Sequence, residues 1–377
     1  MRGVLSLSAA QGCELGGRVS TKTHAEINFE LSCPAPLAAK DTILLGHGSG
    51  GKLSAELIRD IFLPAFQNPV LARLDDQAIV NVNGQRLAIS TDSFVVKPLF
   101  FPGGDIGSLA VHGTVNDLAM GGATPLFLSA GFIIEEGFAM EQLRRVVTSL
   151  QRAAAEAGVH VVTGDTKVVE KGKGDGLFIS TTGIGVVPEG VDLSADRARP
   201  GDKVLLSGSI GDHGIAILAQ REGLEFETQI QSDSAALHTL VAAMLGVTST
   251  VTPEIRCMRD PTRGGVSSTL NEIAERSQVG IELVERSLPI HEQVRGACEL
   301  LGLDPLYVAN EGKLIAIVAP EAADAVLQAM RCHPLGAEAQ IIGTVKKENA
   351  GLVTMRTPFG TTRIVDMLAG DQLPRIC

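Results

Sequence analysis

Residues 105–134 read DIGSLAVHGTVNDLAMGGATPLFLSAGFII, and this stretch decides the fold class. Asp105 is a suitable N-cap for the apolar helix that follows, and Gly121 marks the end of that helix. The apolar residues that come next predict a buried strand. Because similar helices and strands alternate along both halves of the chain, we predict an α/β (α+β) fold.

A change of composition near residue 190 divides the chain. The stretch VPEGVDLSADRARPGDKV is polar and contains prolines, which is typical of a connection between domains. We therefore predict an N-terminal domain over residues 41–190 and a C-terminal domain over residues 191–360. An extension over residues 1–40 and a mobile tail over residues 361–377 flank these domains.

Composition and charge exclude several classes of function. The chain has 377 residues, a net charge of −11, one Tyr and no Trp, whereas a nucleic-acid binder needs a cationic face and aromatic platforms. No long apolar run is present, so we predict no membrane span. The six cysteines form no CxxC pair, which argues against a zinc site and indicates a reducing, cytoplasmic location.

Glycine-rich loops precede three predicted helices. Residues 46–53, GHGSGGKL, nearly match the phosphate-binding P-loop, but Leu53 replaces the hydroxyl residue that a P-loop needs for magnesium. A structural turn and an anion-binding loop therefore stay equally open for this stretch. Residues 208–214, GSIGDHG, and 259–265, RDPTRGG, also leave backbone N–H groups free at a helix start. A fourth stretch, KGKGDG, is typical of a solvated turn.

Acidic residues lie at the ends of apolar elements, where a buried carboxylate without a partner is costly. Any one of them fits a cap or a turn. A shared Mg²⁺ would account for all of them, because magnesium binds a few carboxylates together with substrate phosphates. The acidic residues are Asp75, Asp76, Asp92, Asp117 and Asp165. From this set we predict four magnesium ligands, Asp75, Asp92, Asp117 and Asp165, with Asn116 as a hydrogen-bonding neighbour.

Four further residues attract attention. Lys167 follows Asp165 by two positions, and Glu311 lies just before an apolar strand. Catalytic side chains often lie on loops at strand ends, although a surface ion pair explains both residues as simply. His213, in the second glycine loop, fits a packed, neutral histidine. The chain ends in LPRIC, so the reactive thiol of Cys377 is its last side chain.

Taken together, these motifs resemble one family. The chain resembles the HypE family of [NiFe]-hydrogenase maturation factors in GHGSGGK, DDQA, GTVNDLAMGGATP, VTGDTKVV, GDHG, RDPTRGGV, ANEGK and the terminal PRIC. The interior motifs also resemble the wider aminoimidazole-ribonucleotide-synthetase (PurM-like) superfamily of ATP-using enzymes, and PRIC singles out HypE. The resemblance implies a two-domain PurM-like fold and a homodimer that binds ATP in clefts around its dimerised N-terminal domains.

The resemblance also implies an activity. A carbamoyltransferase, HypF, loads a carbamoyl group onto the terminal cysteine, and HypE uses ATP to dehydrate this thiocarboxamide to a thiocyanate. The cyanide then passes to iron on the HypC–HypD scaffold. In this sequence Cys377 would be the acceptor, Glu311 the base for the elimination and Lys167 the cation near the oxygen. Nucleotide or phosphate contacts are expected from Gly50, Gly51 and Arg263.

Three alternative functions fit the sequence less well. A related ATP-dependent phosphotransferase, such as a selenophosphate synthetase, would carry a reactive residue near the first glycine loop, and that loop has no cysteine. A P-loop NTPase is disfavoured by Leu53. A thiol carrier or assembly scaffold would not require so many acidic residues beside glycine loops.

Overall fold

The helix in the stretch quoted above forms as predicted. α3 (Ile106–Met120) begins at Asp105, whose side chain accepts hydrogen bonds from two N–H groups of the first turn, and it ends at Gly121. Nearly all of its residues are buried, because a sheet and a second helix pack around it. Polar side chains on α3 are therefore held inside the protein.

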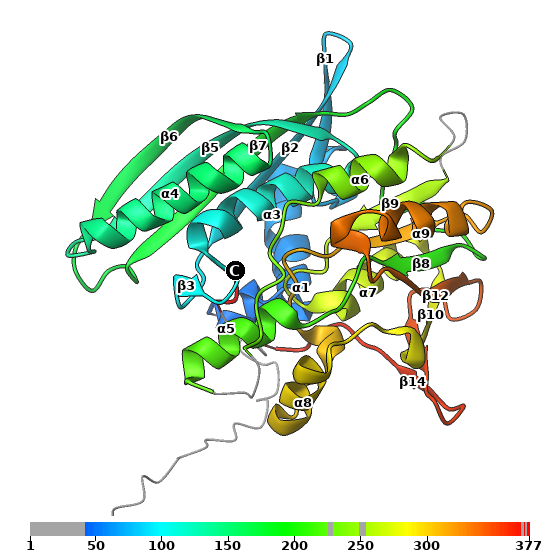
Figure 1. Cartoon of the computed structure of the whole chain (residues 1–377). Helices are drawn as coiled ribbons and strands as arrows, with labels where there is room; N and C mark the ends of the chain where they lie inside the picture. The colour runs from blue at the N-terminus through cyan, green and yellow to red at the C-terminus, as the bar shows by residue number, and fades with distance from the viewer. Residues whose placement is uncertain (1–41, 225–228, 249–253, 371–372, 374) are drawn as a thin grey trace, which may run out of the picture. The chain divides into compact units, whose positions relative to one another are not determined.

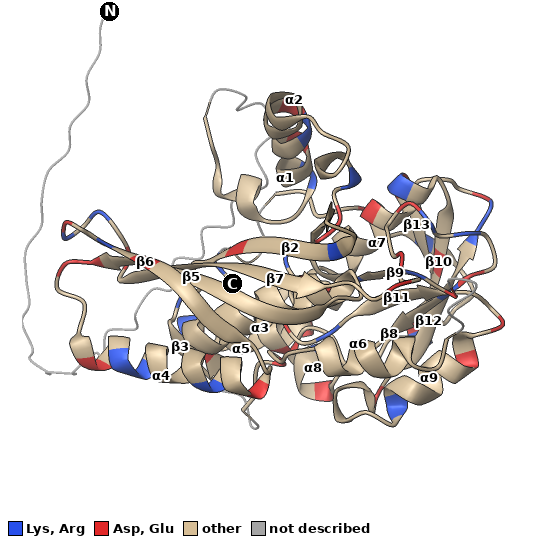
Figure 2. Ribbon diagram, turned by 90° about the horizontal axis from the view of Figure 1, so that it is seen from above, with Lys and Arg blue, Asp and Glu red and all other residues tan. Residues whose placement is uncertain are grey.

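The structure is a computed structural model and describes residues 42–224, 229–248, 254–370, 373 and 375–377. The predicted extension, residues 1–40, lies outside these ranges. The N-terminal sheet has the strand order β1-β2-β7-β5-β6 (Figure 1), and only its β5–β6 pair is parallel. Its strands are β1 (Ala78–Val82), β2 (Gln85–Phe94), β5 (Thr124–Glu135), β6 (His160–Val169) and β7 (Leu177–Val186). Figure 2 shows α3 and α4 (Met140–Glu156) on the same side of this sheet.

The opposite face of this sheet is open along β5 and β6. Phe127 and Ile133 of β5 are 44% and 45% exposed, whereas Leu128 and Ala130 of the same strand are buried. β6, at the edge, is exposed along nearly its whole length. The prediction of a buried strand is thus right for only one face of β5. An exposed apolar face of this kind is typical of a surface that contacts another molecule.

The C-terminal part contains a seven-stranded sheet in the order β14-β13-β10-β12-β8-β11-β9. Its strands are β8 (Lys203–Leu206), β9 (Ile255–Arg259), β10 (Gly280–Val284), β11 (Ile315–Val318), β12 (Gln340–Lys346), β13 (Val353–Arg356) and β14 (Thr362–Ile364). Its helices are α5 (Asp212–Glu222), α6 (His238–Leu245), α7 (Gly265–Ser277), α8 (Glu292–Leu301) and α9 (Ala323–Arg331). One core cluster joins the strands to α7, and another joins them to α6 and α9. None of the described helices has the length and apolar character needed to cross a membrane.

The end of the chain returns to the first glycine loop, which leads into α1 (Lys52–Leu57), a π-turn (Ile58–Phe62) and α2 (Leu63–Phe66). The Lys52 N–H donates to the Leu368 carbonyl at 2.9 Å, and the Ser49 hydroxyl donates to the Gly370 carbonyl at 2.8 Å. The chain then ends beside the β3–β4 hairpin (Phe100–Phe101 and Gly104–Asp105) and α5 (Figure 1). The final residues therefore lie against the body of the protein.

Candidate active site

Four carboxylates from separate segments lie close together. Asp76 precedes β1, Asp92 lies in β2, Asp117 lies on α3 and Asp260 follows β9. Burial is the largest cause that raises the pKa of each carboxyl, and that of Asp260 rises to about 6. The negative charges of the other three raise the pKa of Asp117 further. We call these four residues the acid cluster.

Hydrogen bonds and ion pairs within the protein offset the cost of burying the acid cluster only in part. Asp76 Oδ1 lies 2.7 Å from the Arg259 guanidinium, and the Ser90 hydroxyl donates to Asp117 Oδ2 at 2.5 Å. Asp76 Oδ2 is buried and has no hydrogen-bond partner. A buried carboxylate oxygen without a partner is costly unless a cation meets it. The acid cluster therefore fits a bound cation.

Protein side chains alone do not enclose a metal ion in the described part of the chain. No group of three or more His, Cys, Asp or Glu side chains there has the spacing that would hold one. Magnesium differs from most protein-bound metals because it retains waters and is commonly held by one or two carboxylates together with substrate phosphates. The acid cluster fits that arrangement and not a closed all-protein cage.

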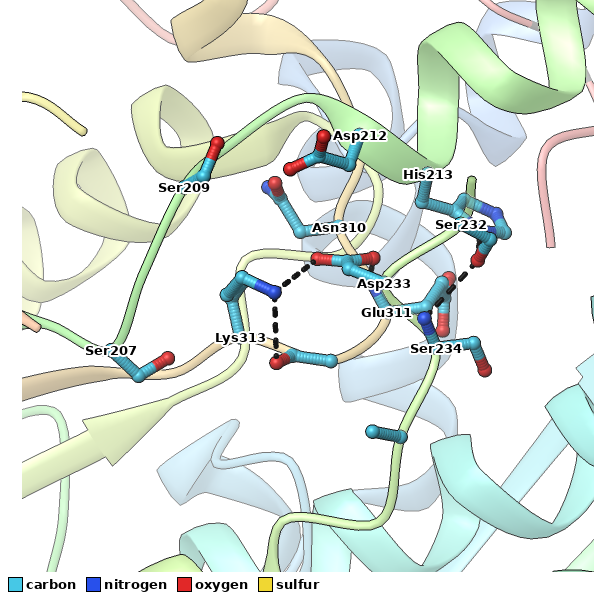
Figure 3. Close-up of polar contacts among 12 residues, drawn as sticks. Ser207, Ser209, Asp212, His213, Ser232, Asp233, Ser234, Asn310, Glu311 and Lys313 are labelled. Carbon is cyan, nitrogen blue, oxygen red and sulfur yellow. Dashed lines mark hydrogen bonds and ion pairs between the residues drawn. The ribbon is translucent and has the colours of Figure 1, made fainter. Parts of the chain in front are cut away.

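Glu311 lies on a loop that other segments hold in place (Figure 3). Its N–H donates to Asp233 Oδ1 at 3.0 Å, and its carbonyl accepts from the Asn116 side chain at 3.2 Å. Asp233 also pairs with Lys313, its Oδ2 lying 3.1 Å from Nζ. The Glu311 side chain is buried and its Oε1 has no hydrogen-bond partner. Burial, followed by the charge of Asp92, raises its pKa well above the usual range, which suits a group that exchanges protons.

The last residue of the chain lies at the same place. Burial raises the pKa of the Cys377 thiol to about 12, and the positive charge of Arg263 opposes that rise. The charges of Glu311, Asp92 and Asp117 add to it. Cys377 is in turn the largest cause that raises the pKa of Arg263. The sulfur, one guanidinium and three buried acids thus share one site.

The first glycine loop contacts this site through backbone packing. Arg263 Nη1 donates to the Gly48 carbonyl at 2.9 Å. A Cβ added to Gly50, which has a φ of +72°, would lie 2.5 Å from the Arg263 carbonyl oxygen. A Cβ added to Gly51 would lie 2.2 Å from the carbonyl oxygen of Leu368. This packing gives both glycines a structural reason, and their contacts with nucleotide stay a prediction.

Asp75, a predicted magnesium ligand, has partners of its own. Its Oδ1 accepts from the Ala195 N–H at 3.1 Å and from the Ser194 hydroxyl at 3.3 Å. Its Oδ2 accepts from Arg73 Nε at 3.0 Å. Both oxygens therefore bind groups of the protein, and a role at a metal stays a prediction.

Asp165 and Lys167 do not reach the acid cluster within one chain. They lie on β6, three strands away from β2, a separation of about 14 Å across the sheet. The strand register aligns Asp92 with Gly164, so Asp165 points to the opposite, open face. Lys167 Nζ lies 2.6 Å from Asp165 Oδ2, and both side chains are 68% exposed. The hydrogen bond from the Lys167 side chain is the largest cause that lowers the pKa of Asp165.

Two acidic residues of the site were not among the sequence predictions. Asp260 directly follows a strand, as Asp165 was predicted to do, and this position is the signal that could have identified it. Asp233 lies in an extended segment between α5 and α6 that carries no comparable signal. Its role became visible only when the fold placed it against Glu311.

Two family models match the chain. The model described as AIR synthase related protein, N-terminal domain, matches residues 74–187, and the corresponding C-terminal domain model matches residues 199–355. The protein named carbamoyl dehydratase HypE in Azotobacter vinelandii is 62% identical over 331 residues, which cover 88% of this chain and 96% of that protein. The chain belongs to the HypE family.

Solved HypE structures agree with this assignment. A HypE in complex with ATP is 53% identical, with a TM-score of 0.75, and the match covers 89% of this chain and 100% of that one. A chain of a HypE–HypF complex is 51% identical, with a TM-score of 0.78, and the match covers 83% of this chain and 99% of that one. The predicted PurM-like α/β fold and the predicted membership of the HypE family are thus confirmed.

Proposed function

We propose that this HypE-family chain is an ATP-dependent carbamoyl dehydratase that acts on its own Cys377. A thiocarboxamide, –S–C(=O)–NH₂, on that residue loses one water and becomes a thiocyanate, –S–C≡N. This group supplies the cyanide ligand for the iron centre of a [NiFe]-hydrogenase. The observation that carries the proposal is the position of Cys377 among Arg263, Glu311 and buried carboxylates. Relatives named carbamoyl dehydratase HypE and the HypE structure with ATP support it.

ATP balances the reaction by accepting the oxygen as phosphate. The thiocarboxamide oxygen attacks the γ-phosphorus of ATP, ADP leaves, and the nitrogen loses one proton. The nitrogen then loses its second proton while the carbon–oxygen bond breaks, so that C≡N and inorganic phosphate form. The protein must therefore position the phosphates, neutralise charge and accept protons.

Glu311 is the proton acceptor in this scheme. Its Oε1 is buried without a hydrogen-bond partner, and its backbone is held by Asp233 and Asn116. The charge of Glu311 raises the pKa of the Cys377 thiol, which supports a position of the carboxyl near the carbamoyl group of a loaded tail. A base of raised pKa is effective near neutral pH because it can take a proton and later release it.

Arg263 and a cation held by the acid cluster would neutralise the charge of the phosphates. Arg263 lies between Cys377 and the first glycine loop, where a guanidinium would stabilise negative charge on the transferred group. Mg²⁺ would be held by residues of the acid cluster, and when bound it neutralises the phosphate charge. The predicted ligand Asp75 would first have to exchange partners, and the predicted ligand Asp165 would have to come from another chain.

A homodimer would bring Asp165 and Lys167 to a site. Their side chains are exposed on the open face of the N-terminal sheet, which also exposes Phe127 and Ile133. A second copy on this face would cover the apolar side chains and would direct its own β6 toward the first copy. Lys167 would then act as the cation near the oxygen in the site of its partner.

Two further interactions complete the proposal. HypF loads Cys377 with the carbamoyl group, as the solved HypE–HypF complex supports. The HypC–HypD scaffold receives the cyanide. Both steps and a cytoplasmic location follow the resemblance and the cysteine content described above.

Mass spectrometry of the carbamoylated full-length chain tests the proposal. After loading by HypF, incubation with ATP and Mg²⁺ should remove one water from the C-terminal peptide, and incubation without ATP should leave its mass unchanged. A Cys377→Ala chain is the control and should bind ATP but carry no modification. Consumption of ATP with no loss of water from the loaded peptide would contradict the dehydratase assignment.

A further inference from the structure

The last three residues lie alongside the segment that follows β2. The Val95 N–H donates to the Cys377 carbonyl at 2.9 Å, and the Lys97 N–H donates to the Arg375 carbonyl at 3.2 Å. The two bonds run in the antiparallel sense, but Arg375 has a φ of +54° and residues 375–377 do not form a regular strand. Backbone bonds of this kind supply affinity, and side-chain contacts supply selectivity. Ile376 is buried in the core cluster that also contains Phe94.

His213 binds the backbone of Ile376. The imidazole is fully buried, with Nε2 at 2.8 Å from the Ile376 carbonyl and Nδ1 at 2.8 Å from the Ser232 hydroxyl. Because a carbonyl only accepts, Nε2 carries the hydrogen and Nδ1 accepts from Ser232. Burial lowers the pKa of His213, which keeps the ring neutral, as predicted for a packed histidine.

Arg375 makes contacts with several segments. Its Nε donates to the Val95 carbonyl at 3.1 Å, and its Nη1 donates to Asp175. The guanidinium carbon lies 5.9 Å from the centre of the Phe178 ring, within the range of a cation–π contact. Arg221 at the end of α5 donates to the Arg375 carbonyl at 2.8 Å. The side chain and the backbone of Arg375 are therefore both recognised.

Asp175 lies in the KGKGDG turn, which the sequence indicated was only solvated. Glu135 holds this turn by accepting from the N–H groups of Gly172 at 2.5 Å and Gly176 at 2.9 Å. Lys97 is a second cation on Asp175, with Nζ 3.2 Å from Oδ1. When the tail leaves, Arg375 leaves with it and Lys97 stays. Asp175 therefore has one partner, Lys97, that is independent of the tail, and a second partner, Arg375, that is present only when the tail is bound.

We infer that Asp175 is a positioning residue that recognises Arg375 and so sets the fraction of time that Cys377 spends in the site. The inference rests on the proposed function, in which Cys377 has to leave the site to be loaded and then return. It gives a role to Arg375, which lies two positions before the acceptor cysteine and binds Asp175. The ammonium group of Lys97 disfavours binding of the tail, because it and the Arg375 guanidinium repel each other on the same carboxylate.

Alkylation of Cys377 by iodoacetamide in the full-length chain measures this equilibrium. The rate is read from the C-terminal peptide by mass spectrometry, so the other cysteines do not interfere. Asp175→Asn and Arg375→Gln should each accelerate alkylation about 5-fold, the effect expected for a partly buried charged hydrogen bond. Lys97→Gln should slow it about 2-fold. Glu156→Gln, an exposed acid at the end of α4, is the matched control and should change nothing.

Exchanging the charges of Asp175 and Arg375 distinguishes specific recognition of the tail from a general loosening of the structure. Asp175→Lys combined with Arg375→Glu should restore most of the protection of Cys377, whereas each substitution alone should lose it. Unchanged alkylation in Arg375→Gln, which alters only the end of the chain, would overturn the inference. So would acceleration by Asp175→Asn that the exchanged pair does not reverse.

The same experiment distinguishes this inference from the proposed function. Alkylation needs neither ATP nor HypF, so protection that follows the charge at position 175 supports the recognition of Arg375 even if the loaded chain loses no water. Conversely, dehydration with no effect of Asp175 on protection would leave the enzyme assignment intact and remove the role of this turn.

Discussion

At the scale of single residues, Glu311 shows a conflict between catalysis and stability. Burial raises the pKa of this carboxyl, so the ionised form is disfavoured in the folded chain. Because the folded pKa lies above the unfolded value of about 4.3, the folded state loses stability as the pH rises from there through the folded pKa. A glutamine at this position would not suffer that loss.

We therefore expect Glu311→Gln to be more stable and inactive. In the absence of nucleotide its Tm at pH 8 should exceed that of the unsubstituted chain by about 1–3 °C, and the difference should disappear near pH 4. Dehydration of the loaded tail should fall by about 100-fold or more. Calorimetry across this pH range, with exposed Glu156→Gln as control, checks the first part. A Glu311→Gln chain that is less stable at pH 8 would contradict it.

A second prediction concerns Asp260. Because its charge acts on both Asp76 and Asp117, we expect Asp260→Asn to weaken ATP binding in Mg²⁺ about 10-fold or more, as Asp117→Asn should. The difference between variant and unsubstituted chain should shrink when EDTA removes the metal. Isothermal titration calorimetry measures both affinities, and Asp60→Asn on the exposed π-turn is the control. Equal affinity for Asp260→Asn in Mg²⁺ would remove this residue from the metal site.

The sequence identified Asp92, Asp117 and Glu311 as site residues, and the structure brings them together around Cys377. It could not show that Asp165 lies away from this group within one chain. In a strand, a shift of one residue turns a side chain to the opposite face, and Asp165 is one position out of register with Asp92. Local pattern alone does not reveal that register.

At the scale of elements, the capping residues made the ends of α3 predictable. The environment of β5 was difficult to predict, because the protein covers only one of its faces. Asp105 and Gly121 marked both ends of α3 in the sequence. β5 has apolar residues on both faces, and such a run is typical of a strand covered on both sides. The structure covers one face only. Nothing in the sequence indicates that apolar side chains such as Ile133 lie on an uncovered face.

The first glycine loop yields a prediction with an internal control. Gly50→Ala and Gly51→Ala place a methyl group against a carbonyl oxygen at 2.5 Å and 2.2 Å. Each should lower the free energy of unfolding by about 1–3 kcal/mol. Gly48→Ala in the same loop meets nothing within 4 Å and should cost less than about 0.5 kcal/mol. Urea denaturation compares the three, and an equal cost at all three positions would show that backbone contact is not the cause.

At the scale of the whole molecule, the proposed homodimer would explain the exposed position of Lys167. If Lys167 serves the site of its partner, two inactive chains should complement each other. A Lys167→Ala chain keeps its Cys377, and a Cys377→Ala chain keeps its Lys167. Mixed dimers of the two should therefore dehydrate the tail of the Lys167→Ala chain, at up to the rate of one normal site.

Co-expression with different tags isolates these mixed dimers, and the loss of water from the C-terminal peptide measures their activity. Each variant alone should be inactive as a homodimer, which provides the control. An inactive mixed dimer would mean that Lys167 acts within its own chain or not at all. A chain that remains a monomer by light scattering would contradict the homodimer itself.

The pairing of the tail with Val95 and Lys97 has a consequence for throughput. If Cys377 is the reactant, each polypeptide carries a single load, and a new round cannot start until those backbone bonds have opened. Above saturation, extra nucleotide would not speed delivery. The amount of cyanide delivered in the cell would then depend on the number of copies of the protein and on the rate at which the tail dissociates.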